Sequence, residues 1–194
     1  MADHYRTRLP LRSPADPDPA IAAPLAATAA AIGMVPNLYA AMANFPALLE
    51  SYGFGYQRFR EQSGFSPIEQ EVVLLTISRV HECSYCVAAH SLAADMARVP
   101  PGVTEAVRND LPIADERLQA LRELTREMVV TRGFPTAGKV EAFVAAGYAE
   151  RQILAILLAI SIKVISNYTN HLFDTELDPA FTGRAWAGGA TPPA

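Results

Sequence analysis

The hydrophobic and polar positions along the chain follow the pattern of helices. One segment shows this clearly, with apolar side chains at the three- to four-residue spacing of a helix face: Ile68, Val72, Leu75 and Val80. Further apolar residues between these positions make the segment 68–80 apolar nearly all round, which predicts a buried helix. Glu71 is therefore an ionisable group inside an apolar helix.

The same pattern, punctuated by proline, glycine and capping residues, predicts helices along the rest of the chain. The expected helices cover residues 21–33, a short stretch capped by Asn37, 46–62, 67–80, 83–99, 103–109, 115–131, 137–146 and 149–173. Ser66-Pro67 gives the best-signalled start, with serine as the cap and Glu69 in the first turn. Nothing predicts a run of strands, so the expected fold class is all-α, a helical bundle.

The two ends of the chain differ in composition from the middle. Residues 1–19 are rich in proline and mixed charge, which predicts an extended arm that wraps a surface or a neighbouring subunit. Residues 20–181 are expected to form a single helical domain. Residues 182–194 are expected to be a flexible tail, in which Trp186 carries no functional signal.

An internal similarity relates two apolar segments, about 66–99 and 147–173. When the sequence is aligned with itself so that Gln152 matches Glu71, Asn167 matches Cys86 and His171 matches His90. The domain is therefore a candidate for two related helical halves packed about a pseudo-twofold axis.

Composition and charge exclude several classes of protein. The chain of 194 residues is 51% hydrophobic and 19% charged, which is typical of a folded globular protein. Its net charge is -4 and no basic cluster could neutralise a row of phosphates, so we expect no nucleic-acid partner. The first residues lack the apolar region of a secretory signal. The apolar run 153–165 contains Lys163 and is shorter than the roughly 20 residues of a bilayer span. We therefore expect a cytoplasmic protein without a membrane partner.

The candidate chemistry lies in Cys83-Ser84-Tyr85-Cys86 and in His90. Two close cysteines in a reducing compartment are redox-active or metal-binding more often than structural. Zinc could use this pair with His81 and His90, but zinc fingers usually bring a second pair, which the chain lacks. Two inert buried thiols are the third alternative. Spacing and compartment favour a redox centre.

Helix geometry gives each residue of this centre its own position. With Cys83 at the N-cap of a helix, free backbone N–H groups and the positive end of the helix dipole favour a thiolate. Cys86 lies three residues from Cys83 and four from His90, so both pairs share a helix face and His90 can take a proton from Cys86. A tight turn at residues 81–82 would bring Glu71 to the depth of His90, where a carboxylate would orient the imidazole.

Three further residues are candidates for a pocket wall near the centre. Tyr85 lies between the two cysteines. Asn167 and His171 follow the last apolar run in a polar segment and align with the centre in the internal comparison. A helix C-terminal cap is the alternative role for His171.

The segment EVVLLTISRVHECSYCVAAH resembles the core motif of the alkyl hydroperoxidase D-like, or carboxymuconolactone decarboxylase, superfamily, with the pattern E-x11-C-x2-C-x3-H. The resemblance extends over about residues 32–181. It implies an all-α protein that assembles into trimers or hexamers and reduces a hydroperoxide substrate without a cofactor or metal, at the expense of an external dithiol or protein reductant. Carried over, it makes Cys86 the residue that forms a sulfenic acid, Cys83 the resolving thiol, and Glu71 and His90 the proton relay.

One position departs from the motif of the redox members, which carry a histidine where this chain has Tyr85. A phenol is a poor base at neutral pH, so the relay would lack one member. The decarboxylase branch, which acts on lactones, generally lacks the cysteine pair. We therefore expect a thiol-dependent peroxidase, with a lactone enzyme and a non-catalytic redox sensor or metal clip as the alternatives.

Overall fold

The computed structural model describes residues 4–188, which are helical and contain no strand. The helices are α1 (Pro19–Ile32), α2 (Asn37–Met42), α3 (Pro46–Gln62), α4 (Pro67–Val80), α5 (Ser84–Met96), α6 (Pro101–Arg108), α7 (Glu116–Val130), α8 (Ala137–Ala145), α9 (Gln152–Phe173) and the 3-10 helix η1 (Pro179–Arg184). The predicted all-α fold class is confirmed.

The start of α4 follows from its local sequence. Ser66 Oγ accepts the Glu69 backbone N–H at 3.3 Å, and Glu69 Oε2 accepts the Ser66 backbone N–H at 2.7 Å. This capping box satisfies N–H groups that a helix start otherwise leaves unpaired. The start of α2 differs from its prediction: Asn37 is the first helical residue and not the cap. Its backbone N–H donates instead to the Asp178 carboxylate, 3.2 Å away.

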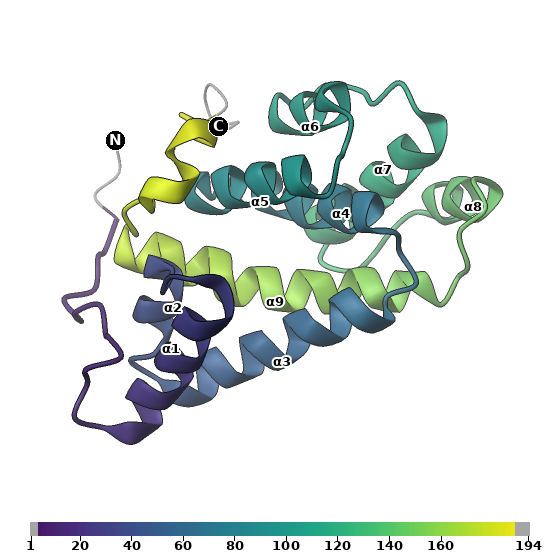
Figure 1. Ribbon diagram of the computed structural model, residues 1–194. Helices are drawn as coiled ribbons and strands as arrows, with labels where there is room; N and C mark the ends of the chain where they lie inside the picture. The colour runs from purple at the N-terminus through teal and green to yellow at the C-terminus, as the bar shows by residue number, and fades with distance from the viewer. Residues whose placement is uncertain (1–3, 189–194) are drawn as a thin grey trace.

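Helix α4 forms the centre of the molecule (Figure 1). Every residue from Glu69 to Ser78 is buried, and α5, α6, α7 and α9 all pack against it. A helix with neighbours on all sides needs apolar side chains on all sides, which explains the continuous apolar pattern of this segment.

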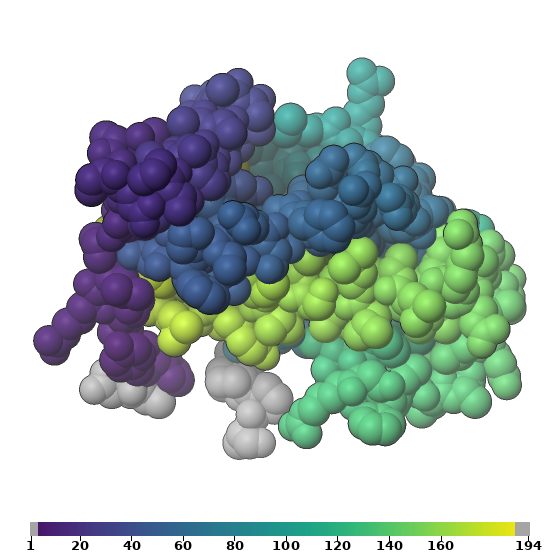
Figure 2. Space-filling view, turned by 90° about the horizontal axis from the view of Figure 1, so that it is seen from below, coloured from purple at the N-terminus to yellow at the C-terminus, as the bar shows by residue number. Residues whose placement is uncertain are grey.

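Helix α9 runs the length of the molecule between α3 on one side and α4 and α5 on the other (Figure 1). α3 approaches it closely at Gly55, where an added Cβ would lie 2.6 Å from Ile162 Cγ2. A strip of α9 reaches the surface between α3 and the α7–α8 pair (Figure 2), and Leu154 and Leu157 of α9 are exposed. Among residues 4–188, α9 is the one helix long and apolar enough to cross a membrane. Its other face packs into the bundle, as a core helix does.

The N-terminal arm lies on the surface of its own chain. The Thr7 backbone N–H donates to the Leu172 carbonyl at 2.8 Å, and the Arg12 backbone N–H donates to the Ala40 carbonyl at 3.0 Å. The arm is thereby tied to the end of α9 and to α2.

The sequence predicts a flexible tail from residue 182 onwards. In the structure, the segment after residue 182 contacts the helical bundle as far as Trp186. Arg108 donates to the carbonyl oxygens of Arg184 at 3.1 Å and Ala185 at 3.0 Å. The guanidinium of Arg79 lies over the Trp186 ring, 5.1 Å from its centroid. Residues 189–194 of the expected tail lie outside the described residues.

The two segments related by the internal similarity differ in local structure. Residues 66–99 contain α4, a turn and α5, whereas residues 147–173 contain one uninterrupted helix, α9. The relation between two halves stays a prediction, as do the single-domain organisation and the trimer or hexamer.

Candidate active site

A tight turn joins α4 to α5 and places the cysteine pair at the start of α5. Glu82 takes the left-handed conformation, with φ of 55°, and the Cys83 backbone N–H donates to the Ser78 carbonyl at 3.1 Å. Cys83 is the N-cap residue of α5 and Cys86 lies in its first turn, as the spacing predicts.

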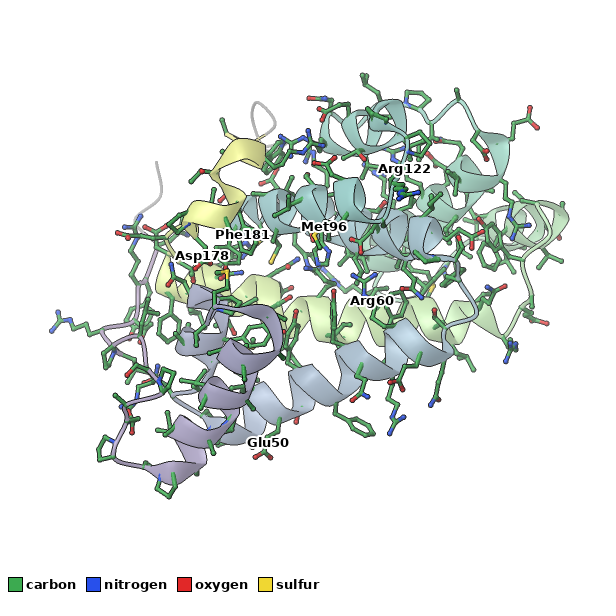
Figure 3. The ribbon with its side chains drawn as sticks, in the orientation of Figure 1. Glu50, Arg60, Met96, Arg122, Asp178 and Phe181 are labelled. Atoms are coloured by element: carbon green, nitrogen blue, oxygen red, sulfur yellow. The ribbon has the colours of Figure 1, made fainter. Side chains whose placement is uncertain are left out.

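The turn brings Glu71 of α4 beside His90 of α5. His90 Nδ1 lies 3.0 Å from Glu71 Oε2. Because an ionised carboxylate only accepts, Nδ1 carries the proton and Nε2 is left as an acceptor. Arg60 of α3, labelled in Figure 3, donates to Glu71 Oε1 at 2.5 Å. The contact that the helix hairpin was expected to make is therefore present.

Burial and nearby charges set the protonation of this pair. Burial raises the pKa of Glu71, but the contacts with His90 and Arg60 outweigh burial and hold that pKa below its usual value. Burial and the Lys163 ammonium lower the pKa of His90 to about 4, although Glu71 acts in the opposite direction. At neutral pH the pair is thus a carboxylate and a neutral imidazole.

Asn170 of α9 connects the two sulfurs. Its Nδ2 lies 3.2 Å from Cys86 Sγ and 3.8 Å from Cys83 Sγ, within hydrogen-bonding range of both. Neither cysteine is in a disulfide, and both are buried. A single side-chain amide therefore positions the cysteine pair from outside the helix hairpin.

Lys163 of α9 brings a buried positive charge to the same place. Its side chain is only 1% exposed. Burial raises the pKa of Cys86, but the hydrogen bond from Cys83, the charge of Lys163 and the amide of Asn170 outweigh burial and lower the pKa to about 6. The hydrogen bond that Cys83 donates to Cys86 raises the pKa of Cys83, and burial raises it further. Cys86 is therefore the thiolate of the pair and Cys83 the thiol.

Tyr85 ties α5 to the C-terminal segment. Its hydroxyl donates a short hydrogen bond to Asp178 and accepts the Leu38 backbone N–H at 3.4 Å. Its ring packs edge-on against Phe181, which lies near Asp178 (Figure 3), with the ring centroids 5.7 Å apart. Burial and the Asp178 carboxylate raise the pKa of Tyr85, so the phenol stays neutral and has no base function at pH 7.

A cavity of about 620 Å³ lies beside Cys83. Its wall consists of the arm around Tyr5, the turn between α4 and α5, and the end of α9. Cys83 and Asn170 are part of this wall and Cys86 is not.

Two of the three residues predicted for a pocket wall, Tyr85 and His171, line this cavity, and Asn167 does not. Asn167 is buried, and its Nδ2 donates to His81 Nδ1 at 2.9 Å. The amide that reaches the sulfurs belongs to Asn170, one turn further along α9. The internal alignment selected the other asparagine because α9 continues straight where the first segment turns, so aligned positions are not equivalent in space.

Four polar residues at the site were not predicted for it: Arg60, Lys163, Asn170 and Asp178. They come from α3, α9 and the segment after α9, all distant in sequence from the cysteine motif. Only Lys163 leaves a signal in the sequence, as a charge within the most apolar run of the chain.

Within residues 4–188, no group of three or more His, Cys, Asp or Glu side chains is arranged to hold a metal ion. His81 and His90, the candidate zinc ligands beside the cysteines, bind Asn167 and Glu71.

The bundle, the helix hairpin with its C-x-x-C pair and the buried glutamate–histidine contact define a protein with the alkyl hydroperoxidase D-like fold. No protein-family model and no curated protein matches the sequence. Several solved structures match the chain, and two of them match nearly its whole length. One is an uncharacterized peroxidase-related protein from Silicibacter sp. TM1040, with a TM-score of 0.76, 21% identity, and coverage of 95% of this chain and 98% of that chain.

The other is an uncharacterized peroxidase-related protein from Ralstonia eutropha JMP134, an alkylhydroperoxidase AhpD core. Its TM-score is 0.78 and its sequence is 18% identical, and the match covers 98% of this chain and 100% of that chain. The fold implied by the sequence motif is thus confirmed.

Proposed function

We propose that the protein is a thiol-dependent peroxidase that reduces hydroperoxides at Cys86. The main support is the surroundings of Cys86, where the hydrogen bond from Cys83, the charge of Lys163 and the amide of Asn170 outweigh burial and lower the thiol pKa to about 6. The nucleophile in such a reaction is the thiolate and not the thiol. The peroxidase-related description of the two similar structures agrees with this proposal.

The cycle has two steps on the protein. In the first, the Cys86 thiolate attacks a hydroperoxide oxygen, the O–O bond breaks, and the departing alkoxide takes up a proton to become an alcohol. Cys86 is left as a sulfenic acid. In the second, the Cys83 sulfur attacks the Cys86 sulfur, the hydroxyl leaves with the thiol proton as water, and a disulfide forms. A dithiol of the reducing cytoplasm then donates two electrons and becomes a disulfide itself.

His90 and Glu71 form the proton-handling pair in this proposal. Glu71 accepts a hydrogen bond from Nδ1–H of His90 and fixes the tautomer, so Nε2 of the neutral imidazole is left as a hydrogen-bond acceptor. The hydrogen bonds of residues 4–188 do not join His90 to either sulfur. We therefore assign the proton transfer to an intervening water.

Removal of each sulfur in turn tests the proposal. Cys86→Ser is expected to abolish peroxide consumption driven by dithiothreitol, because no thiolate attacks the O–O bond. Cys83→Ser is expected to complete a single attack and to retain a sulfenic acid on Cys86, which mass spectrometry detects after dimedone labelling. Turnover that persists in Cys86→Ser would contradict the proposal.

Two other outcomes distinguish the alternative functions. A reaction on small lactones that survives the loss of both cysteines indicates the decarboxylase type of enzyme. A disulfide that forms and is reduced without catalytic peroxide consumption indicates a redox sensor.

A further inference from the structure

Lys163 carries a charge that is buried without a carboxylate partner. It is 1% exposed, and no carboxylate oxygen of residues 4–188 lies within 4.0 Å of its ammonium. A buried ammonium without a counter-ion is strongly unfavourable, because burial removes its hydration. Some other negative group must therefore stabilise it in the folded protein.

The position of Lys163 on α9 identifies that group. Lys163, Asn167 and Asn170 follow one another at intervals of four and three residues, so they share one helix face. All three are buried, and the Asn170 amide on this face contacts both sulfurs. The anion available to this face is the thiolate of Cys86.

The other ionisable groups around Cys86 and Lys163 are neutral or already paired. Tyr52 of α3, Cys83 and Tyr85 interact with the Cys86 sulfur, whereas the lowered pKa values of His81 and His90 reflect the charge of Lys163. Glu71 of α4 is paired with Arg60 of α3 and with His90. Burial raises the pKa of both phenols, so neither carries a charge at neutral pH. Among residues 4–188, Lys163 is the cation left to pair with the thiolate.

We propose that Lys163 tunes the redox potential of the cysteine pair: its ammonium pairs with the Cys86 thiolate in the reduced protein and loses its counter-ion when the Cys83–Cys86 disulfide forms. This inference rests on the disulfide of the proposed function. It makes Lys163 a positioning residue that acts through Cys86, and it predicts a disulfide that is easily reduced.

The reduction step accounts for every electron and proton. The disulfide takes two electrons and one proton from a dithiol, which becomes a disulfide and releases its second proton to solvent. The products on the protein are the Cys83 thiol and the Cys86 thiolate. Lys163 stabilises the thiolate, but its ammonium has no counter-ion when the disulfide is present. It therefore shifts the equilibrium towards the reduced protein. Stabilisation of the reduced form is the known route to an oxidising disulfide.

Replacement of the charge tests this inference. Lys163→Met keeps the length and removes the ammonium, and Lys163→Arg keeps the charge. In redox buffers of glutathione or dithiothreitol, Lys163→Met is expected to lower the equilibrium constant for reduction at least about tenfold, which makes the potential about 30 mV more negative. Lys163→Arg is expected to stay close to the native value. Lys139→Met removes a partly exposed lysine paired with Glu123 and is expected to change neither the potential nor the thiolate titration.

The ultraviolet absorbance of the thiolate gives a second readout, the pH midpoint of its titration. A purely structural role of Lys163 would not change this midpoint. In the reduced native protein the thiolate is expected to titrate with the pKa of Cys86, about 6. In Lys163→Met the midpoint should move towards the ordinary cysteine value of about 8.5. Lys163→Gln provides the same comparison if the methionine variant does not fold.

An unchanged potential and an unchanged titration midpoint in the uncharged variants would overturn this role for Lys163. Failure of the peroxidase proposal has a different signature. The native protein would then form and lose its disulfide at a measurable potential, with the predicted response to Lys163→Met, but would not turn over hydroperoxide.

Discussion

At the scale of single residues, the buried His90 and the partly buried His81 couple the stability of the fold to pH. The pKa of His90 is lowered to about 4 by burial and by Lys163, and the pKa of His81 is lowered to about 4 by burial, Lys163 and His171. The ordinary value is about 6.5. Between about pH 6.5 and 4 the unfolded chain therefore binds protons that the folded chain does not. The free energy of unfolding is expected to fall as the pH is lowered through this window, and urea unfolding at about pH 7 and 4.5 measures the change.

Replacing one histidine separates this effect from general acid sensitivity. His90→Gln removes one of the two titrations and keeps an amide that can donate to Glu71. The difference in unfolding free energy between the two pH values should be smaller in this variant than in the native protein. His4→Gln changes an exposed histidine and should leave that difference as it is. Equal differences in native protein and His90→Gln would show that His90 is not the group responsible.

Some of these residue contacts could be predicted from the sequence. The Glu71–His90 contact follows from a helix hairpin whose two arms have fixed lengths, so rise per residue is enough to place it. The contact of Asn170 with the sulfurs could not be predicted. Helix periodicity shows that this face of α9 is buried, but it does not show which neighbouring helix the face meets or at what depth.

At the scale of elements, the close approach of α3 to α9 depends on a missing side chain. Gly55→Ala places a Cβ 2.6 Å from Ile162 Cγ2, whereas Gly53→Ala on the same helix meets nothing within 4 Å. Both changes gain the same helix propensity, about 1 kcal/mol. Overpacking costs about 1–3 kcal/mol, so Gly55→Ala should be less stable than Gly53→Ala by about that amount. Urea unfolding of the two variants measures the difference, and equal stabilities would mean that the helices move apart freely.

Most elements could be predicted because their ends are coded locally. Ser66 and Glu69 cap α4 with contacts three residues apart, and the predicted range of α3 agrees with the observed one, Pro46–Gln62. The start of α2 was predicted less well, because Asp178, far along the chain, binds the Asn37 N–H. The docking of the C-terminal segment by Arg108 was missed for the same reason.

At the scale of the whole molecule, the N-terminal arm closes one side of the cavity beside Cys83. Thr7→Pro removes the backbone N–H that donates to Leu172 and is expected to release the start of the arm. A bulky maleimide should then modify the cysteine pair severalfold faster, as followed by mass spectrometry. The Arg6–Asp174 ion pair is too exposed to hold the arm by itself.

The neighbouring residue supplies a matched control. Arg8→Pro also introduces proline into the arm, but the backbone N–H of Arg8 makes none of the hydrogen bonds of residues 4–188. Its modification rate should stay near that of the native protein. Equal acceleration in both variants would indicate a general loosening of the arm and not the loss of one hydrogen bond.

The contribution of α9 to the site also sets when the site is completed during synthesis. The ribosome makes the chain from its N-terminus, so both cysteines emerge well before Lys163 and Asn170. An unfinished chain carries the C-x-x-C pair with an ordinary cysteine pKa of about 8.5, and its thiols are mostly protonated at neutral pH. We expect the thiolate to form when α9 docks and brings Lys163 and Asn170 to the cysteine pair. Newly made chains are then expected to oxidise slowly until their last long helix is in place.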